Sequence, residues 1–158
     1  MTTSRDFALA ELLRVFPQVL VRGRAAQHVC AECNDICDHL AQRTWAQVTR
    51  EFLSSNCDVL PLLSPEAYSA YLAAWLREAL LCPDEGVATM VLINLGSSPP
   101  VSGFNAEQAR VIISAAREIA SGSIWGPDDE ATERSIAAIE ETWSRVPANP
   151  AGVTPSKR

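Results

Sequence analysis

The stretch "LLSPEAYSAYLAAWLREALLCP", residues 62–83, carries the clearest structural signal in the chain. Ser64 is a favourable N-cap residue, Pro65 suits the first helical position, and Glu66 favours the positive end of a helix dipole. Pro83 cannot continue a helix. Between these signals an apolar stripe recurs at helical spacing. We therefore predict a helix here, whose core-facing stripe comprises Tyr68, Tyr71, Leu72, Trp75, Leu76, Ala79 and Leu80.

Upstream of this stretch the apolar residues again recur with a helical period. Residues 7–16 form one such segment, which ends at Pro17. A second segment runs over about residues 30–42, and a short helix is expected over residues 44–53 with Thr44 as its cap.

Downstream, "GVATMVLINLG" (residues 86–96) is apolar on all sides and indicates a central buried helix. The next helix is expected to begin at Asn105, with Gln108 as its capping-box partner, and to end with Gly122 at the C′ position. The last predicted helix has an acidic first turn and a buried seam that includes Trp143. The sequence thus predicts an all-α fold, a compact bundle of about six helices in a single domain over residues 1–146. A flexible Pro-rich tail is expected over residues 147–158.

The totals limit the classes of function. The 158 residues suit one domain, with 47% hydrophobic and 20% charged residues. A net charge of −6 disfavours nucleic acid and anionic membranes as partners, because both select basic surfaces. Neither a secretory signal nor an apolar run long enough to span a membrane is visible. Five cysteines then indicate a reducing compartment, and we expect a cytoplasmic protein.

The densest group of chemically active residues is "HVCAECNDICDHL", which holds His28, Cys30, Cys33, Cys37 and His39. These are ligands that zinc prefers. On one continuous helix, however, Cys30 and Cys37 would lie about 10.5 Å apart along the axis. Two thiolates on one zinc are only about 4 Å apart. A zinc site therefore needs residues 28–33 to form a turn ahead of the helix, with Cys37, or Cys57 or Cys82 from elsewhere, completing the set.

Two other interpretations of this group remain open. The spacing of Cys30, Cys33, Cys37 and Leu40 is also that of a core-facing helix, in which free thiols act as small hydrophobic groups. The Cys-x-x-Cys pair could alternatively support redox chemistry, although no βαβ context surrounds it. A Cys/His nucleophile is disfavoured because no oxyanion hole or orienting carboxylate is evident.

Two acidic segments are candidates for partner binding. They comprise Asp84 with Glu85, and Asp128 with Asp129 and Glu130. Each precedes or opens a predicted helix, so the helix dipole explains them without a function. The functional interpretation is a docking surface for a basic protein partner.

Three motifs together resemble an uncharacterised bacterial family of small helical proteins. They cover roughly residues 28–145 and comprise His28, Cys30, Glu32 and Cys33; Leu63, Ser64, Pro65, Glu66, Ala67 and Tyr68; Phe104, Asn105 and Gln108; and Trp143. The resemblance implies an all-α fold and no known activity.

No P-loop, dinucleotide fingerprint, nucleophile elbow or zinc-protease motif is present in the sequence. The leading hypothesis is therefore a non-enzymatic binding protein of the bacterial immunity or antitoxin type, which neutralises a cognate toxin, such as a basic toxin domain, by surface binding. A small zinc-binding helical protein with a structural His/Cys site is the alternative, and a thiol-based redox protein is the second.

Overall fold

The computed structural model describes residues 3–124, 126 and 128–148, and within them the chain is all-α. Pro147 and Ala148 are exposed, and the rest of the predicted tail lies outside the described residues. The predicted compact helical bundle is confirmed. Its α-helices are α1 (Ser4–Val15), α2 (Ala31–Leu40), α3 (Arg50–Ser55), α4 (Pro65–Leu81), α5 (Gly86–Gly96), α6 (Ala106–Gly122) and α7 (Glu130–Trp143), and its 3₁₀ turns are η1 (Trp45–Gln47), η2 (Leu60–Leu62) and η3 (Val101–Gly103).

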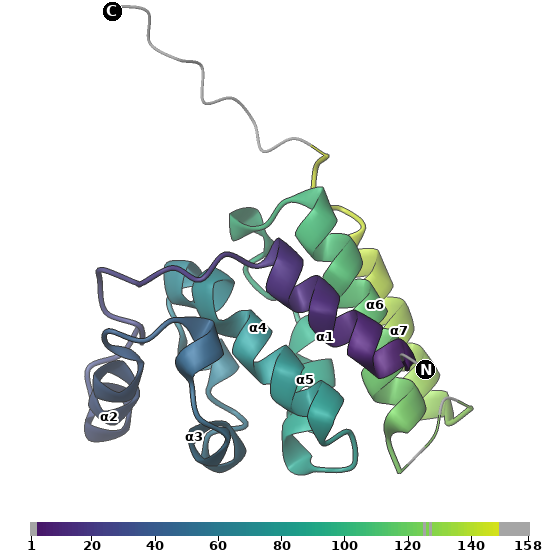
Figure 1. The fold of residues 1–158 in the computed structure, drawn as a ribbon, viewed down its shortest axis with the longest axis horizontal. Coiled ribbons are helices and arrows are strands. Elements are labelled where there is room, and N and C mark those ends of the chain that lie inside the picture. The colour runs from purple at the N-terminus through teal and green to yellow at the C-terminus, as the bar shows by residue number, and fades with distance from the viewer. Residues whose placement is uncertain (1–2, 125, 127, 149–158) are drawn as a thin grey trace, which may run out of the picture.

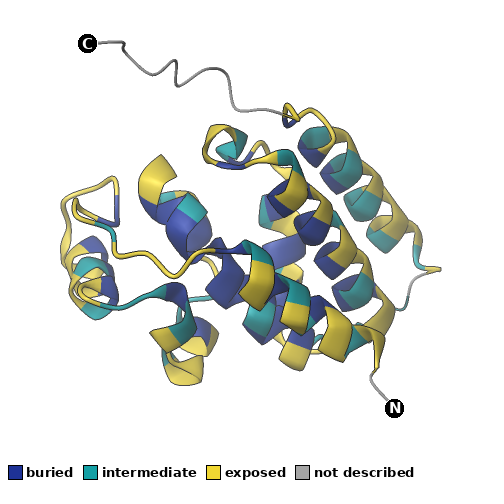
Figure 2. Cartoon of the chain, turned by 45° about the horizontal axis from the view of Figure 1, so that its top comes forward, coloured by how far each residue is buried: buried dark blue, intermediate teal, exposed yellow. Residues whose placement is uncertain are grey.

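Helix α4 forms the centre of the bundle, a place predicted instead for residues 86–96 (Figure 1). The predicted start of α4 is confirmed. The hydroxyl of Ser64 accepts a hydrogen bond from the Ala67 N–H at 3.2 Å, and Pro65 is the first helical residue. The helix packs against α1, α3, α5 and α6, so it is buried on nearly every side. Figure 2 shows the contrast with the outer helices, whose outward faces are exposed.

The aromatic residues of α4 join it to its surroundings through their polar ends. The Tyr71 hydroxyl donates toward the carbonyls of Leu40 and Arg43, at 3.0 and 2.9 Å. The Trp75 indole donates to the Asn56 carbonyl at 3.2 Å. Each side chain is at most 1% exposed, so these bonds satisfy groups that water cannot reach.

Helices α5, α6 and α7 complete the bundle on the other side of α4. α5 is a helix and not a strand, as predicted, and α6 begins with the predicted capping box between Asn105 and Gln108. The buried indole of Trp143 donates to the Leu95 carbonyl at 3.1 Å, which ties α7 to the end of α5. Among the described helices, none combines the length and apolar character needed to cross a membrane.

Three predicted boundaries were wrong. The expected helix over residues 44–53 is divided into η1 and α3, because both Thr44 and Thr49 cap a new turn. α2 ends at Leu40, and Gln42 adopts a φ of 60° just beyond it. Gly122 is the last residue of α6 and not a left-handed C′ residue. Its lack of a side chain is needed elsewhere: a Cβ there would lie 2.9 Å from Cγ of Pro83.

Candidate functional site

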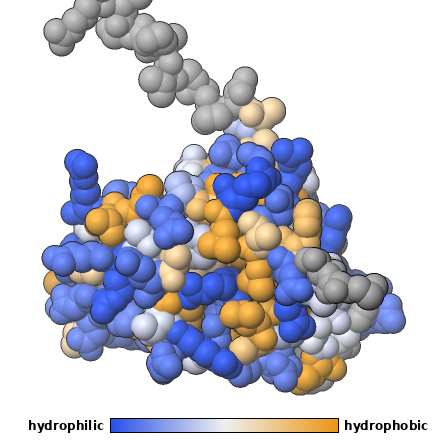
Figure 3. All heavy atoms as spheres, viewed as in Figure 1, coloured by the Kyte–Doolittle hydropathy of each residue, from blue (hydrophilic) through white to orange (hydrophobic). Residues whose placement is uncertain are grey.

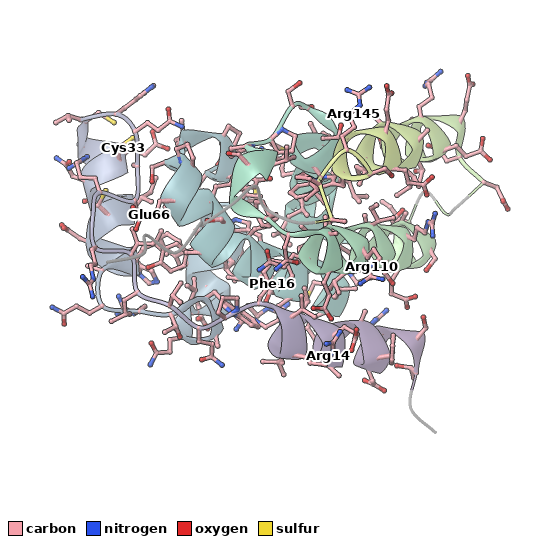
Figure 4. The ribbon with its side chains drawn as sticks, turned by 90° about the horizontal axis from the view of Figure 1, so that it is seen from above. Arg14, Phe16, Cys33, Glu66, Arg110 and Arg145 are labelled. Atoms are coloured by element: carbon pink, nitrogen blue, oxygen red, sulfur yellow. The ribbon has the colours of Figure 1, made fainter. Side chains whose placement is uncertain are left out.

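The first predicted site residues lie at the start of α2, at one side of the molecule where Figure 4 labels Cys33. Cys30 is the N-cap residue of α2, and its sulfur accepts a hydrogen bond from the Cys33 N–H at 3.3 Å. The chain thus turns before the helix, as the zinc hypothesis required. The Cys33 side chain is only 2% exposed, and its hydrogen bond with Cys30, together with burial, raises the pKa of its thiol.

The other predicted metal ligands point in different directions. The Cys37 sulfur accepts a hydrogen bond from the Ala26 N–H at 3.3 Å. Cys57 packs against the hydrophobic core, and His28 is exposed. In the described part of the chain, no three of His28, Cys30, Cys33, Cys37 and Cys57 bring ligand atoms within 4.8 Å of one another. The structure does not assemble the predicted ligand set in one place.

His39, the second histidine of the group, has a packing role. Its ring stacks on Phe52 at 3.8 Å between centroids and 3° between planes. Burial, and to a smaller extent Arg43, lowers the pKa of this imidazole. A neutral ring in contact with an aromatic neighbour is the state that this surrounding favours.

The predicted acidic segments lie at the starts of α5 and α7. Glu85 pairs with Arg50 at 3.1 Å, and Glu130 pairs with Arg134 at 2.8 Å. Asp129 caps α7 by accepting from the N–H and hydroxyl of Thr132, at 3.0 and 3.2 Å. Asp84 and Asp128 are exposed, and neither takes part in an ion pair within the described residues.

A groove between α5 and α7 brings these two acidic segments to one region of the surface. Pro83, which precedes Asp84, lines one part of it, and Asp129 lines another. Its cavity is about 360 Å³, the lower end of the size range of small-molecule or side-chain sites. At the far end of α5 the two helices touch, since a Cβ on Gly96 would lie 3.4 Å from Cβ of Ala138. The remaining lining residues are Ala88, Thr89, Leu92, Ile93, Ser123, Ala131, Thr132 and Ser135.

The lining of this α5–α7 groove suits binding better than catalysis. Most of its lining surface is apolar, and Ile93, one of its lining residues, is 51% exposed. Its one carboxylate, from Asp129, is already committed to capping α7. The groove offers no histidine or thiol to act as a base or nucleophile. Figure 3 shows that, on the face drawn there, hydrophobic residues reach the surface in patches between hydrophilic ones. Exposed apolar patches bordered by polar residues are typical of interaction sites.

The sequence points to the acidic edge of the groove but not to its floor. Helix α5 is apolar on all sides, so its pattern does not show which residues face solvent. The exposed side becomes clear only once α4 and α7 are seen to cover the others. Ile93 and Ser135 are therefore site residues that local pattern could not have identified.

Comparisons with known proteins add no further assignment. No protein-family model, curated protein or solved structure matches this chain. The resemblance to an uncharacterised bacterial family stays a prediction from its motifs.

Proposed function

We propose that this chain is a non-enzymatic protein-binding protein whose α5–α7 groove receives an apolar side chain from a basic segment of its partner. The observation that carries this proposal is a mainly apolar groove lined by Asp129 and Pro83, next to which Asp128 and Asp84 follow in the chain as its acidic edge. An apolar anchor in a pocket, surrounded by charged groups that select the partner, is a common arrangement in protein interfaces.

Charge supports a basic partner. Asp84 and Asp128 are exposed, each next to a residue of the groove region, and the whole chain carries a net charge of −6. Such a surface attracts a cationic segment over several ångströms and accelerates the encounter. The ion pair between Glu130 and Arg134 is highly exposed, at 82% and 70%, so it is weak and can be exchanged for a partner's cation.

The class of partner that we propose is a bacterial toxin with a basic domain, which this chain would neutralise in the cytoplasm as an immunity or antitoxin-like protein. The small size, the acidic charge and the absence of a catalytic constellation in the groove support this assignment. Binding that covers a toxin's active surface requires no chemistry from the inhibitor.

Co-expression with the product of the neighbouring gene tests the proposal. The wild-type chain should form a complex with that product and rescue cells from it. Ile93→Asp should abolish both effects, because a carboxylate would enter the apolar groove. The matched control is Leu13→Asp on α1, which is 58% exposed and does not line the groove. Absence of a complex and of rescue, or equal loss in both variants, would refute the proposal.

A second pair of variants tests the acidic edge. The double variant Asp84→Asn and Asp128→Asn should slow association about tenfold and reduce its dependence on salt. Asp35→Asn with Asp58→Asn makes the same change in net charge at exposed positions outside the groove. If the control pair slows association equally, only net charge matters and the groove edge is not the binding surface.

A further inference from the structure

A compact group of potential metal ligands lies where α4 turns into α5. Glu78 is in the last turn of α4, Cys82 is its C-cap residue, and Glu85 is the N-cap residue of α5. One ligand atom from each lies within 4.8 Å of the other two. The proximity follows from the fold, because Glu78 and Cys82 are one helical turn apart and the short connection brings Glu85 back beside them.

The carboxylate of Glu78 is the unusual member of this group. Its side chain is only 2% exposed, and its Oε1 atom accepts no hydrogen bond from the described residues. Nε of Arg50 lies 3.0 Å from that oxygen, so the two form an ion pair without a well-oriented hydrogen bond. A buried carboxylate whose oxygen accepts no hydrogen bond destabilises the fold unless a cation lies close enough to compensate its charge.

The guanidinium of Arg50 occupies the centre of the group. Its Nη2 atom lies 2.9 Å from the Cys82 sulfur and 3.1 Å from a Glu85 oxygen. One positive charge therefore faces two carboxylates and a thiol. The Arg50 side chain is itself 58% exposed, so it can leave this position for water without opening the core.

We propose that Glu78, Cys82 and Glu85 form a binding site for a zinc-class divalent metal ion, in which the Arg50 guanidinium stands in for the metal in the metal-free protein. The thiol favours zinc over magnesium or calcium, which select oxygen ligands only. Ligands of a tetrahedral zinc ion lie about 3.5 Å apart, which small side-chain rotations can reach from the separations seen here. Three protein ligands leave the fourth position to water.

Metal binding in this site replaces a proton and a guanidinium. In the metal-free protein Nη2 of Arg50 donates to the Cys82 sulfur at 2.9 Å, so the guanidinium fills the site. A bound zinc ion takes the thiolate as ligand, the thiol proton passes to solvent, and Arg50 moves into solvent.

Cobalt and zinc titrations of the full chain test the proposal. Wild-type protein should bind one zinc per chain, and cobalt should produce the intense thiolate-to-metal absorption of a Co–S bond. Cys82→Ser should abolish that absorption. Glu85→Gln should weaken zinc binding at least about tenfold, and because this side chain is 46% exposed the variant keeps the fold. Arg50→Gln should tighten binding, because the competing cation is gone.

Two control variants make the result specific. Cys33→Ser removes a buried thiol of the α2 group, and Glu141→Gln removes an exposed carboxylate of α7. Neither should change zinc affinity or the cobalt spectrum. Less than about 0.2 zinc per chain in the wild type would overturn the proposal. So would a cobalt signal that survives Cys82→Ser or disappears in Cys33→Ser, since the second outcome would assign the metal to the α2 group.

Discussion

Gly122 and Pro83 are in such close contact that a Cβ on the glycine would lie 2.9 Å from the proline ring. The contact joins the end of α6 to the connection between α4 and α5. Pro83, and Ser123 next to Gly122, both line the α5–α7 groove. The shape of the proposed binding surface therefore depends on a position that carries no side chain.

Gly122→Ala is expected to destabilise the protein by about 1–3 kcal/mol, because neither the helix end nor the proline ring can move freely. Urea unfolding gives the free energy, and partner binding in the same variant reports on the groove. Gly86→Ala is the matched control, since nothing lies within 4 Å of its Cβ position. The control should be neutral or more stable by up to about 1 kcal/mol. Equal effects in the two variants would contradict the role of the contact.

Trp143 joins α7 to the bundle both by packing and by its hydrogen bond to Leu95. The side chain is fully buried, and its ring meets Phe104 edge-on at 5.0 Å. Trp143→Phe should lower the free energy of unfolding by about 1–3 kcal/mol, because the Leu95 carbonyl loses its donor and the smaller ring leaves a gap. Trp143→Ala should lower it by about 3–5 kcal/mol. Denaturant unfolding measures both. Phe7→Ala, at a side chain 60% exposed, should change stability by less than about 0.5 kcal/mol. A comparable loss in Phe7→Ala would show that α7 is not specifically anchored.

His39 should make stability depend on pH. Its pKa in the folded chain is below the ordinary 6.5, so the unfolded chain binds a proton more readily than the folded one. The contribution of the neutral His39 to the free energy of unfolding is therefore fully present above pH 6.5. It is lost as the pH falls from 6.5 toward the lower pKa of the folded chain. His39→Phe preserves a ring against Phe52 and removes the titration, so it should flatten the curve measured by urea unfolding between about pH 7 and about pH 5. His28→Gln, at an exposed position, should leave the wild-type slope in place. An unchanged slope in His39→Phe would be inconsistent with this cause.

The five cysteines should differ strongly in their reaction with iodoacetamide. Cys30 is exposed and should be alkylated first, whereas Cys33 and Cys82 are buried and their thiol pKa values are raised. Time-resolved mass spectrometry can follow each site, and all five should react alike in denaturant. Early reaction of Cys33 or Cys82 in the folded protein would instead favour the thiol-based redox hypothesis.

Local chemistry accounts for the part of the fold that the sequence predicted correctly. Ser64 and Asn105 begin helices because each side chain accepts from a backbone N–H three residues on, which a single stretch of sequence reveals. Asp129, expected inside the first turn of the last helix, is instead its N-cap residue. The wrong boundary at Gly122 has a different origin. A glycine at a helix end usually serves a left-handed turn, but here a proline distant in the chain requires it.

The candidate sites depended on contacts that no local pattern encodes. The α5–α7 groove forms because α7 packs against one side of α5 and leaves Ile93 of α5 partly exposed. The buried Glu78 meets Arg50 only because α3 lies beside α4. The His/Cys stretch, in contrast, was predicted as a site from its composition, yet its side chains act separately. Cys30 caps α2, Cys37 accepts a hydrogen bond from Ala26, and His39 stacks on Phe52.

The burial of α4 on nearly every side also predicts where variation in this chain can accumulate. Five alanines of the helix, Ala67, Ala70, Ala73, Ala74 and Ala79, are at most 7% exposed, so a larger residue at any of them would meet a packed neighbour. A saturation scan should therefore find α4 intolerant along almost its whole length, whereas α7 should tolerate changes on its outer face with a helical period. Among related chains, substitutions should therefore be rare along the whole of α4 and frequent on the exposed faces of the helices around it.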